Sequence, residues 1–343
     1  MEDEGNFLKQ LQELLTFGRF DSTYKLALLQ ALADISVENP IDPKTALVTR
    51  SSDIAEKMIK YYWNQASPFR DHHVLQQSHR DQILAIKEIR RIKKISGPSL
   101  IALRQNTELH AELCNQLAVR VRDQPLKRLQ RIGDREVQFL YKPNTNGFAT
   151  IELLPSAHKA LSNLYELVTA AIQGKWVQHV CSIKVNRKAL GPQVELHGFL
   201  FGQGRKSLTK FKAELEKLQL GICLYCGHPL DQSSQIDHFI AWSRYPLDEG
   251  FNLVLCHSQC NNAKKDHIPA LVHLESWVEN LNARGNAFTT KLNELKLPAG
   301  KERTLSVVGW AYSLAESSQL RLWIKGSEFE DCNHRWARLL NIL

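Results

Sequence analysis

The sequence predicts an α+β protein in which mainly helical regions flank a small segment of two strands and one helix. Apolar residues recur at helical spacing through much of residues 6–119. Strand-like runs with a Gly-containing turn come next. Further along, residues 223–260 hold four of the seven cysteines, in two close pairs. We therefore expect the cysteine-bearing segment to be a separate domain held together by a metal ion.

The first region, residues 1–122, is expected to be a helical domain. Residues 24–35 are apolar nearly all round, which predicts a buried central helix. Residues 80–95 predict a helix with isoleucines on one side and cations on the other. The cationic side either follows the phosphates of a nucleic acid or is an ordinary solvated surface. The cations that a nucleic acid would meet there are Arg90, Arg91, Lys93 and Lys94.

Residues 123–205 predict an α+β linker domain that contains a hairpin. The Asn-Thr-Asn-Gly sequence at 144–147 is a turn between two strands, and residues 157–172 predict a helix. A helical bundle followed by a hairpin fits either a winged-helix-like DNA reader or a purely structural domain. The expected strands are residues 126–132, 137–141, 149–154, 176–185 and 194–201.

Composition limits the class of protein. Hydrophobic residues make up 43% and charged residues 23% of the 343 residues, as in soluble globular proteins. No apolar run reaches the roughly 18 residues that a membrane helix needs. The opening residues, MEDEGNF, lack the order of a secretory signal, so we expect a cytoplasmic protein with reduced thiols. A net charge of +8 favours a polyanionic partner, although many ordinary proteins are as basic.

The cysteine pairs are spaced as zinc ligands. Two residues separate Cys223 from Cys226, and three separate Cys256 from Cys260. Four thiolates would close the tetrahedral shell of one Zn²⁺, which makes the ion structural. His228 and His257 lie beside the cysteines and are alternative ligands. A cysteine quartet alone is also compatible with many binding modules.

The residues between and after the cysteine pairs carry chemistry. Asp237 and His238 lie in a short strand-like run, where neighbouring side chains face opposite ways. Asn252 opens a second strand, and its amide can hold the intervening loop or fix the tautomer of the imidazole. Asn261 lies in the first turn of a helix, and two lysines, Lys264 and Lys265, follow it. The positive end of a helix and nearby lysines suit a phosphate.

Residues 223–265 resemble the HNH endonucleases, whose ββα-metal core has this order of cysteine pair, Asp-His, Asn, cysteine pair with Asn or His, and Lys. The resemblance implies that His238 is the general base and that Asp237 and Asn261 hold one Mg²⁺ or Mn²⁺ ion. It implies that Asn252 orders the loop and orients His238, and that Lys264 or Lys265 neutralises phosphate charge. Asn262 replaces Asn261 if the helix starts one residue later. An asparagine in place of the last histidine favours ions that prefer oxygen.

The resemblance implies an enzyme that cuts or nicks DNA by hydrolysing phosphodiester bonds, with RNA as an alternative substrate. The nuclease domain is expected at residues 206–285 and a C-terminal helical region at 286–343, with helices at 305–314 and 320–343. The architecture is similar to that of prokaryotic restriction and antiphage-defence HNH proteins. That similarity implies a companion subunit that restrains or targets the nuclease, since an unchecked nuclease would damage its host. The chain has no NTPase motif, so any ATP-driven step belongs to a companion such as an ATPase.

Two other hypotheses fit the same sequence. The chain is then a non-catalytic zinc module that binds nucleic acid, or an adaptor subunit of a larger defence complex. Cleavage by the purified chain, and its dependence on His238, separates these hypotheses from the nuclease hypothesis.

Overall fold

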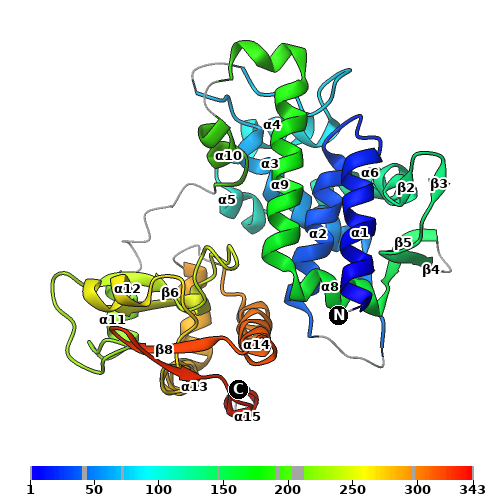
Figure 1. The fold of residues 1–343 in the computed structure, drawn as a ribbon. Coiled ribbons are helices and arrows are strands. Elements are labelled where there is room, and N and C mark those ends of the chain that lie inside the picture. The colour runs from blue at the N-terminus through cyan, green and yellow to red at the C-terminus, as the bar shows by residue number, and fades with distance from the viewer. Residues whose placement is uncertain are drawn as a thin grey trace. The chain divides into compact units, whose positions relative to one another are not determined.

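The described residues fold into two compact units (Figure 1). One unit spans residues 1–37 and 41–204, and the other spans 38–40 and 205–343. The division at 204/205 lies beside the expected start of the nuclease domain at 206. We expected two domains before that point, at residues 1–122 and 123–205. Apart from residues 38–40 and 205, both fall in the first unit. The computed structural model describes residues 2–40, 45–70, 73–144, 147–190, 193–202, 212–294 and 298–341.

The first unit is mainly helical, and its helix α2 (Tyr24–Glu38) is buried on nearly every side, as its apolar sequence predicts. Helix α9 (Tyr165–Ser182) packs beside it, and the Tyr165 hydroxyl donates to the Asp34 carboxylate at 2.9 Å. The other helices of this unit are α1 (Glu2–Phe17), α3 (Ser51–Gln65), α4 (Leu84–Ser96), α5 (Leu100–Gln105), α6 (Thr107–Asp123), α7 (Pro125–Arg128), α8 (Pro155–Asn163), η1 (Lys184–Lys188) and α10 (Gln193–Phe201).

The strands of the first unit form two small antiparallel sheets. A three-stranded sheet has the order β1-β5-β4, and a two-stranded hairpin joins β2 to β3. Leu153 of β5 pairs with Leu47 of β1 and Tyr141 of β4. The strands are β1 (Leu47–Arg50), β2 (Arg131–Ile132), β3 (Arg135–Glu136), β4 (Tyr141–Asn144) and β5 (Gly147–Leu153).

Several expected strands of this unit are wrong. Residues 176–185 and 194–201 fall mostly in helices α9 and α10, because the buried Trp176, Val177 and Val180 recur at helical spacing. The short helix α7 begins at Pro125 and so takes up the first residues of the strand expected at 126–132. The strand expected at 137–141 begins only at Tyr141, whereas the one at 149–154 corresponds to β5. Residues 145 and 146 of the expected turn lie outside the described residues.

The second unit has a two-stranded sheet at its centre, formed by β6 (Gln235–His238) and β7 (Leu253–Cys256). The strands are antiparallel, with Gln235 opposite Cys256 and His238 opposite Leu253. Its helices are α11 (Lys212–Leu218), η3 (Gly250–Asn252), α12 (Ser258–Lys264), α13 (Leu271–Glu294), α14 (Lys301–Ser317) and α15 (Arg335–Leu340). A second hairpin joins β8 (Arg321–Lys325) to β9 (Glu328–Asp331).

The C-terminal region differs from the expected pair of helices. Residues 305–314 are helical within α14, but residues 320–343 contain the β8–β9 hairpin before the short helix α15. Trp323 explains the strand: its backbone N–H donates to Ile268 and its carbonyl accepts from Ala270. Gly326, with a φ of 50°, supplies the left-handed residue of the turn.

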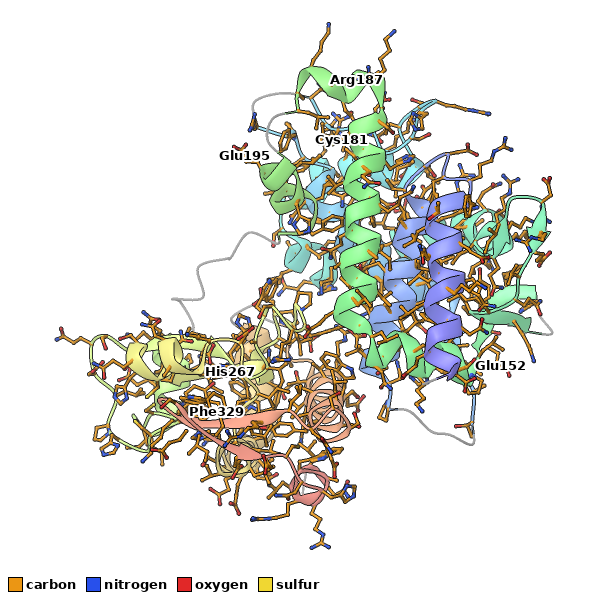
Figure 2. The ribbon with its side chains drawn as sticks, in the orientation of Figure 1. Glu152, Cys181, Arg187, Glu195, His267 and Phe329 are labelled. Carbon is orange, nitrogen blue, oxygen red and sulfur yellow. The ribbon has the colours of Figure 1, made fainter. Side chains whose placement is uncertain are left out.

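The C-terminal elements of the second unit support the β6–β7–α12 group. The Trp277 ring of α13 stacks on Phe239, with ring centroids 4.9 Å apart. The His267 ring, just after α12, packs edge-on against the Phe329 ring of β9, with ring centroids 4.9 Å apart (Figure 2). The fold is thus α+β as predicted, with small antiparallel sheets between helices. Within the residues that the structure describes, no helix is long and apolar enough to cross a membrane.

Candidate functional site

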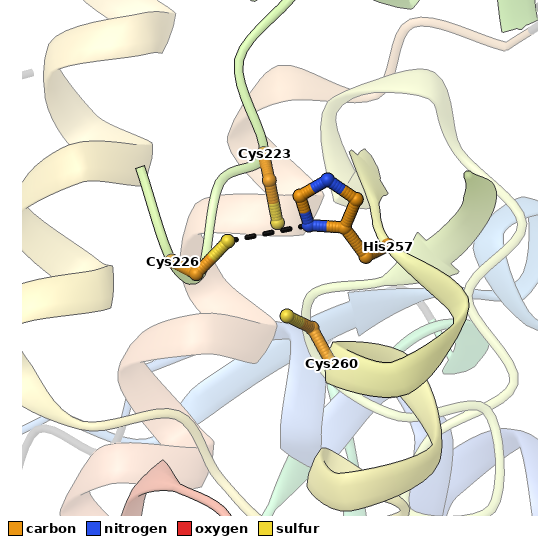
Figure 3. Close-up of side chains that lie close together, drawn as sticks. All are labelled: Cys223, Cys226, His257 and Cys260. Atoms are coloured by element: carbon orange, nitrogen blue, oxygen red, sulfur yellow. Dashed lines mark hydrogen bonds between the residues drawn. The ribbon is translucent and has the colours of Figure 1, made fainter. Parts of the chain in front are cut away.

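Four side chains of the second unit converge in a cluster of metal-ligand type (Figure 3). Cys223 and Cys226 lie in a tight turn before β6, closed by the Gly227 N–H, which donates to the Cys223 carbonyl at 3.0 Å. His257 precedes α12, and Cys260 lies within it. The four ligand atoms all lie within 4.8 Å of one another. Three sulfurs and one imidazole nitrogen are a donor set that fits tetrahedral Zn²⁺.

His257 is oriented as a ligand. Its Nε2 lies 2.9 Å from the Pro229 carbonyl oxygen, a contact that requires a proton on Nε2. In the neutral imidazole Nδ1 then carries the lone pair, and it lies 3.2 Å from the Cys226 sulfur. A metal-ligating histidine commonly donates its other N–H to a carbonyl in this way.

The sequence prediction placed Cys256 in this cluster, and the structure places His257 there instead. Cys256 is the last residue of β7, fully buried opposite Gln235, and its thiol donates to the Gln235 carbonyl at 3.8 Å. Burial and the nearby Asp237 carboxylate raise the pKa of the Cys256 thiol well above its ordinary value. The sequence contained a signal for His257: two residues separate it from Cys260, the same spacing as between Cys223 and Cys226.

The thiols of the cluster affect one another's pKa. Burial raises the pKa of Cys223, but the N–H groups of Cys226, His257 and Tyr225 outweigh it and lower the pKa below its ordinary value. Burial, together with the Cys223 and Cys226 sulfurs, raises the pKa of Cys260 to about 12. Thiolates this close repel one another unless a metal ion lies between them.

Asp237 on β6 is held by two neighbours. Its Oδ2 accepts a hydrogen bond from the Tyr225 hydroxyl at 2.6 Å and pairs with the Lys264 ammonium at 2.9 Å. Burial and the Asp237 carboxylate raise the pKa of Tyr225 well above its ordinary value, so the hydroxyl stays protonated and donates. Lys264 is fully buried and also donates to the His238 carbonyl at 2.9 Å. The structure therefore makes Lys264 an internal cation and leaves Lys265 exposed.

Asn261 approaches the same face of β6 as Asp237. Its side-chain amide on α12 donates to the Gln235 side chain at 3.2 Å. Gln235 and Asp237 are two residues apart in one strand, so their side chains share a face. Asn262 is exposed at the next position of α12. Asp237 and Asn261 are thus brought together on one side of the small sheet.

His238 has different surroundings. Its Nε2 lies 3.4 Å from Asp248 Oδ1, and its ring centroid lies 5.4 Å from that of Trp242. Among the described residues, no hydrogen bond joins the His238 ring to Asp237 or Asn261. Asp248 was missed by the sequence analysis, because it lies in a loop with no recognisable spacing to the other site residues.

Asn252 is fully buried and holds the loop between the two strands. Its side-chain oxygen accepts from the Ile240 N–H at 2.9 Å, and its amide donates to the carbonyls of Ile240 at 3.1 Å and Leu247 at 3.2 Å. Its backbone carbonyl accepts from Phe239 at 2.7 Å. These bonds fix the loop that begins after His238 and carries Asp248.

Comparison with known protein families gives two matches. Residues 4–198, more than half of the chain, match a domain of unknown function, DUF8808. Residues 223–270 match the HNH endonuclease family. The chain belongs to the DUF8808 family and carries an HNH endonuclease domain. No curated protein and no solved structure gave a match.

The HNH match spans every site residue described above, from Cys223 to Lys265. It supports the family resemblance and, with it, a nuclease type of domain whose general partner is DNA. The Cys₃His cluster lies within the matched residues and fits the zinc knuckle of this kind of domain. The DUF8808 match covers most of the first unit and assigns no function to it.

The cations of α4 that were predicted to bind nucleic acid lie outside the HNH domain. They differ in whether their charged groups already have partners within the protein. Arg91 is paired with Glu88 at 2.8 Å and with Glu112 at 2.5 Å. The Lys93 ammonium donates to the Trp63 carbonyl at 2.5 Å, and burial lowers its pKa to about 8. The other two predicted cations of this helix, Arg90 and Lys94, are exposed and form no ion pair with another described residue.

Proposed function

We propose that this chain is a metal-dependent endonuclease that hydrolyses DNA phosphodiester bonds, by cutting or nicking, through its HNH domain. The observation that supports this most is the position of Asp237 and Asn261 on one face of β6, beside a Cys₃His cluster. The HNH match over the same residues supports it independently. A zinc module that only binds needs no carboxylate and amide at these places.

The oxygen donors of Asp237 and Asn261 suit a hard divalent ion such as Mg²⁺ or Mn²⁺. Tyr225 and Lys264 hold Asp237 Oδ2, and within the described residues Oδ1 has no hydrogen-bond partner. That oxygen and the Asn261 amide oxygen would hold the ion. When bound, the ion would act as a Lewis acid on the oxygens of the scissile phosphate.

His238 is the proposed general base. Hydrolysis of a phosphodiester at neutral pH needs a base that exchanges protons there, and histidine is the side chain suited to it. Asp248 contacts Nε2 of His238 at 3.4 Å and so limits the orientation of the ring. Asn252 fixes the loop between them by its hydrogen bonds to Ile240 and Leu247. Exposed Lys265 is the lysine available to meet the phosphate backbone.

Zn²⁺ in the Cys₃His cluster would be structural. Four protein donors fill a tetrahedral shell and leave no position for water or substrate. The ion would join the turn before β6 to the start of α12, and so fix the helix that carries Asn261. The cytoplasm keeps thiols reduced and is the compartment in which we place the protein.

A plasmid cleavage assay tests this proposal. We expect the full chain with Mg²⁺ or Mn²⁺ to nick or cut DNA, and His238→Ala to lower the rate by about 10²–10⁴-fold. His334→Ala, at a side chain that is 78% exposed, is the matched control and should cleave as wild type. Zinc content and circular dichroism check that both variants fold. Equal cleavage by wild type and His238→Ala would refute the assignment of the base.

We also propose that the enzyme acts in prokaryotic restriction or antiviral defence with a companion subunit such as an ATPase. This rests on the combination of a late HNH domain with a large helical unit. Co-purification with the products of neighbouring genes tests it. Cleavage that needs no partner and harms the host would contradict it.

One observation favours a second candidate, a zinc module that binds nucleic acid without cutting it. The buried Lys264 already neutralises the Asp237 carboxylate, as happens in sites that hold no ion. Under this hypothesis the full chain binds DNA but leaves plasmid intact with every divalent ion. The same plasmid assay, with a gel-shift measurement beside it, decides between the two.

A further inference from the structure

The DUF8808 region contains a polar cavity of about 380 Å³. Its walls come from the segment between α1 and α2, the start of α2, the α6–α7 junction and the β2–β3 hairpin. A volume of this size is within the range of pockets that hold small molecules. The charged side chains that line it are Arg19, Lys25, Arg128, Arg131, Asp21 and Asp134.

The walls of this pocket are held by backbone contacts. Gly18, at the end of α1, forms a β-bridge with Ile132 of the hairpin. A Cβ at position 18 would clash with the Leu14 carbonyl, so glycine permits this tight end of α1. Gly133 has a φ of 60° and makes the turn of the hairpin. The β-bridge thus joins the segment after α1 to the β2–β3 hairpin, and both segments line the cavity.

The cations of the pocket form no ion pairs with carboxylates among the described residues, and the Lys25 ammonium lies over the Phe20 ring, 5.9 Å from its centroid. None of Arg19, Arg128 and Arg131 forms an ion pair with another residue that the structure describes. Four cations against two carboxylates leave a surplus of two positive charges around the cavity. Arg91 of α4, by contrast, is paired with both Glu88 and Glu112. Unpaired like charges around one cavity repel one another, and an anion relieves that repulsion.

Lys25 records the excess of positive charge. Its side chain is half-buried, and its pKa is lowered to about 8, mainly by burial. Asp21 acts in the opposite direction, while Arg128, Arg131 and Arg19 contribute to the lowering. An anion in the cavity would favour the charged form of this lysine.

We propose that this pocket binds a phosphate monoester. A monoester carries about −1.5 to −2 charges near pH 7, which matches the surplus of the pocket, whereas a single carboxylate carries only one. Guanidinium groups bind phosphate oxygens through two parallel hydrogen bonds, and three arginines line this cavity. The ester belongs to a free small molecule or to the end of a nucleic acid. All lining residues lie in the first unit, so binding is measured without reference to the HNH domain.

Calorimetric titration of the full chain with 5′-AMP tests the proposal. We expect saturable binding to wild type and a loss of at least about 10-fold in affinity in the double variant Arg128→Gln/Arg131→Gln, as two charge-assisted contacts disappear. Arg187→Gln/Lys188→Gln removes two exposed charges of η1 instead and should bind as wild type (Arg187 is labelled in Figure 2). Circular dichroism and thermal unfolding without ligand check that both double variants fold.

Two further titrations identify the source and the group. Adenosine, which lacks the phosphate, should not bind. A 5′-phosphorylated oligonucleotide that binds with the same dependence on Arg128 and Arg131 assigns the site to a nucleic-acid end, and binding of 5′-AMP alone assigns it to a small molecule. Absence of binding by both phosphate esters, or equal affinity of the Arg128→Gln/Arg131→Gln variant and wild type, would overturn the proposal.

The pH dependence supplies an independent readout. Bound phosphate raises the pKa of Lys25 above the value of about 8 that this lysine has in the protein without ligand. Affinity should therefore stay level just below pH 8 and fall as pH rises through and above it, while the nearby arginines stay charged and Asp21 stays ionised. In Lys25→Met this fall should vanish. A fall of the same size in Lys25→Met would count against a phosphate beside Lys25.

Discussion

The Cys₃His cluster and the Asp237 site lie in one small domain but differ in how their charges are balanced. The cluster gathers three cysteines and His257 within 4.8 Å, and no cationic side chain takes part in the group. Asp237 instead has the buried Lys264 ammonium at 2.9 Å and the Tyr225 hydroxyl at 2.6 Å. The first site fits an external cation such as Zn²⁺, whereas the second contains its own cation. Metal removal and mutation should therefore affect the two sites in opposite ways.

Loss of zinc should have the largest effect. The binding free energy of a structural zinc, about 10–16 kcal/mol in small domains, is largely folding free energy. We expect Cys260→Ala to lose zinc and the β6–β7–α12 fold together. Cys256→Ala should keep zinc and cost only about 1 kcal/mol, the order expected for a small buried group.

Zinc content and amide hydrogen exchange in β6 and β7 measure this difference. Protection of these strands should disappear in Cys260→Ala and persist in Cys256→Ala. Equal zinc loss in the two variants would return Cys256 to the cluster and contradict the geometry of His257. Removal of Mg²⁺ or Mn²⁺, by contrast, should stop cleavage and leave the same protection in place.

Loss of the buried Lys264 ammonium should have the next largest effect, a decrease in the free energy of unfolding. Lys264→Met leaves Asp237 partly buried without its ammonium, and breaking one side of such a pair costs about 3–5 kcal/mol. Lys265→Met is a matched control at the adjacent exposed lysine and should change the free energy of unfolding by less than about 0.5 kcal/mol. Urea unfolding of the zinc-loaded chain measures both.

The double variant Lys264→Met/Asp237→Asn sharpens this test. Removal of both charges should restore part of the lost stability, because the double variant contains no buried carboxylate without a cationic partner. Additive losses in the two single variants and the double variant would show that the two side chains do not interact. Such additivity would also remove the contrast with the metal cluster.

The sequence indicated the segment that carries this candidate site but not the contacts within it. The order of Asp237, His238, Asn252 and Asn261 follows from local strand and helix patterns, and the HNH match covers the same segment. The pairing of Asp237 with Lys264 depends on how α12 packs on β6, which the spacing does not encode. The position of Lys264 soon after Asn261 in the expected helix suggested a lysine that meets the phosphate, whereas the structure buries it.

The fold shows the same division between local and tertiary information. The apolar sequence of α2 predicted a buried helix, because burial on every side leaves no polar stripe. The short apolar runs of α9 and α10 were misread as strands, because a buried helix and a buried strand give the same pattern over a few residues. The cations of α4 looked alike in sequence, yet Arg91 and Lys93 are held by neighbours from other elements.

Substitution of Asp248 should have a smaller effect than loss of zinc or of the Lys264 ammonium. It extends the comparison to His238. Its carboxylate lies 3.4 Å from Nε2 of the proposed base, so it is a positioning residue that does not touch the phosphate. Asp248→Asn keeps an oxygen acceptor and should lower kcat by about 10-fold with KM nearly unchanged, less than the 10²–10⁴-fold expected for loss of the base. Asp266→Asn, at an exposed carboxylate after α12, is the control. A kcat of Asp248→Asn equal to that of the control would make the contact structural only, and a proportional rise in KM would move Asp248 to substrate binding.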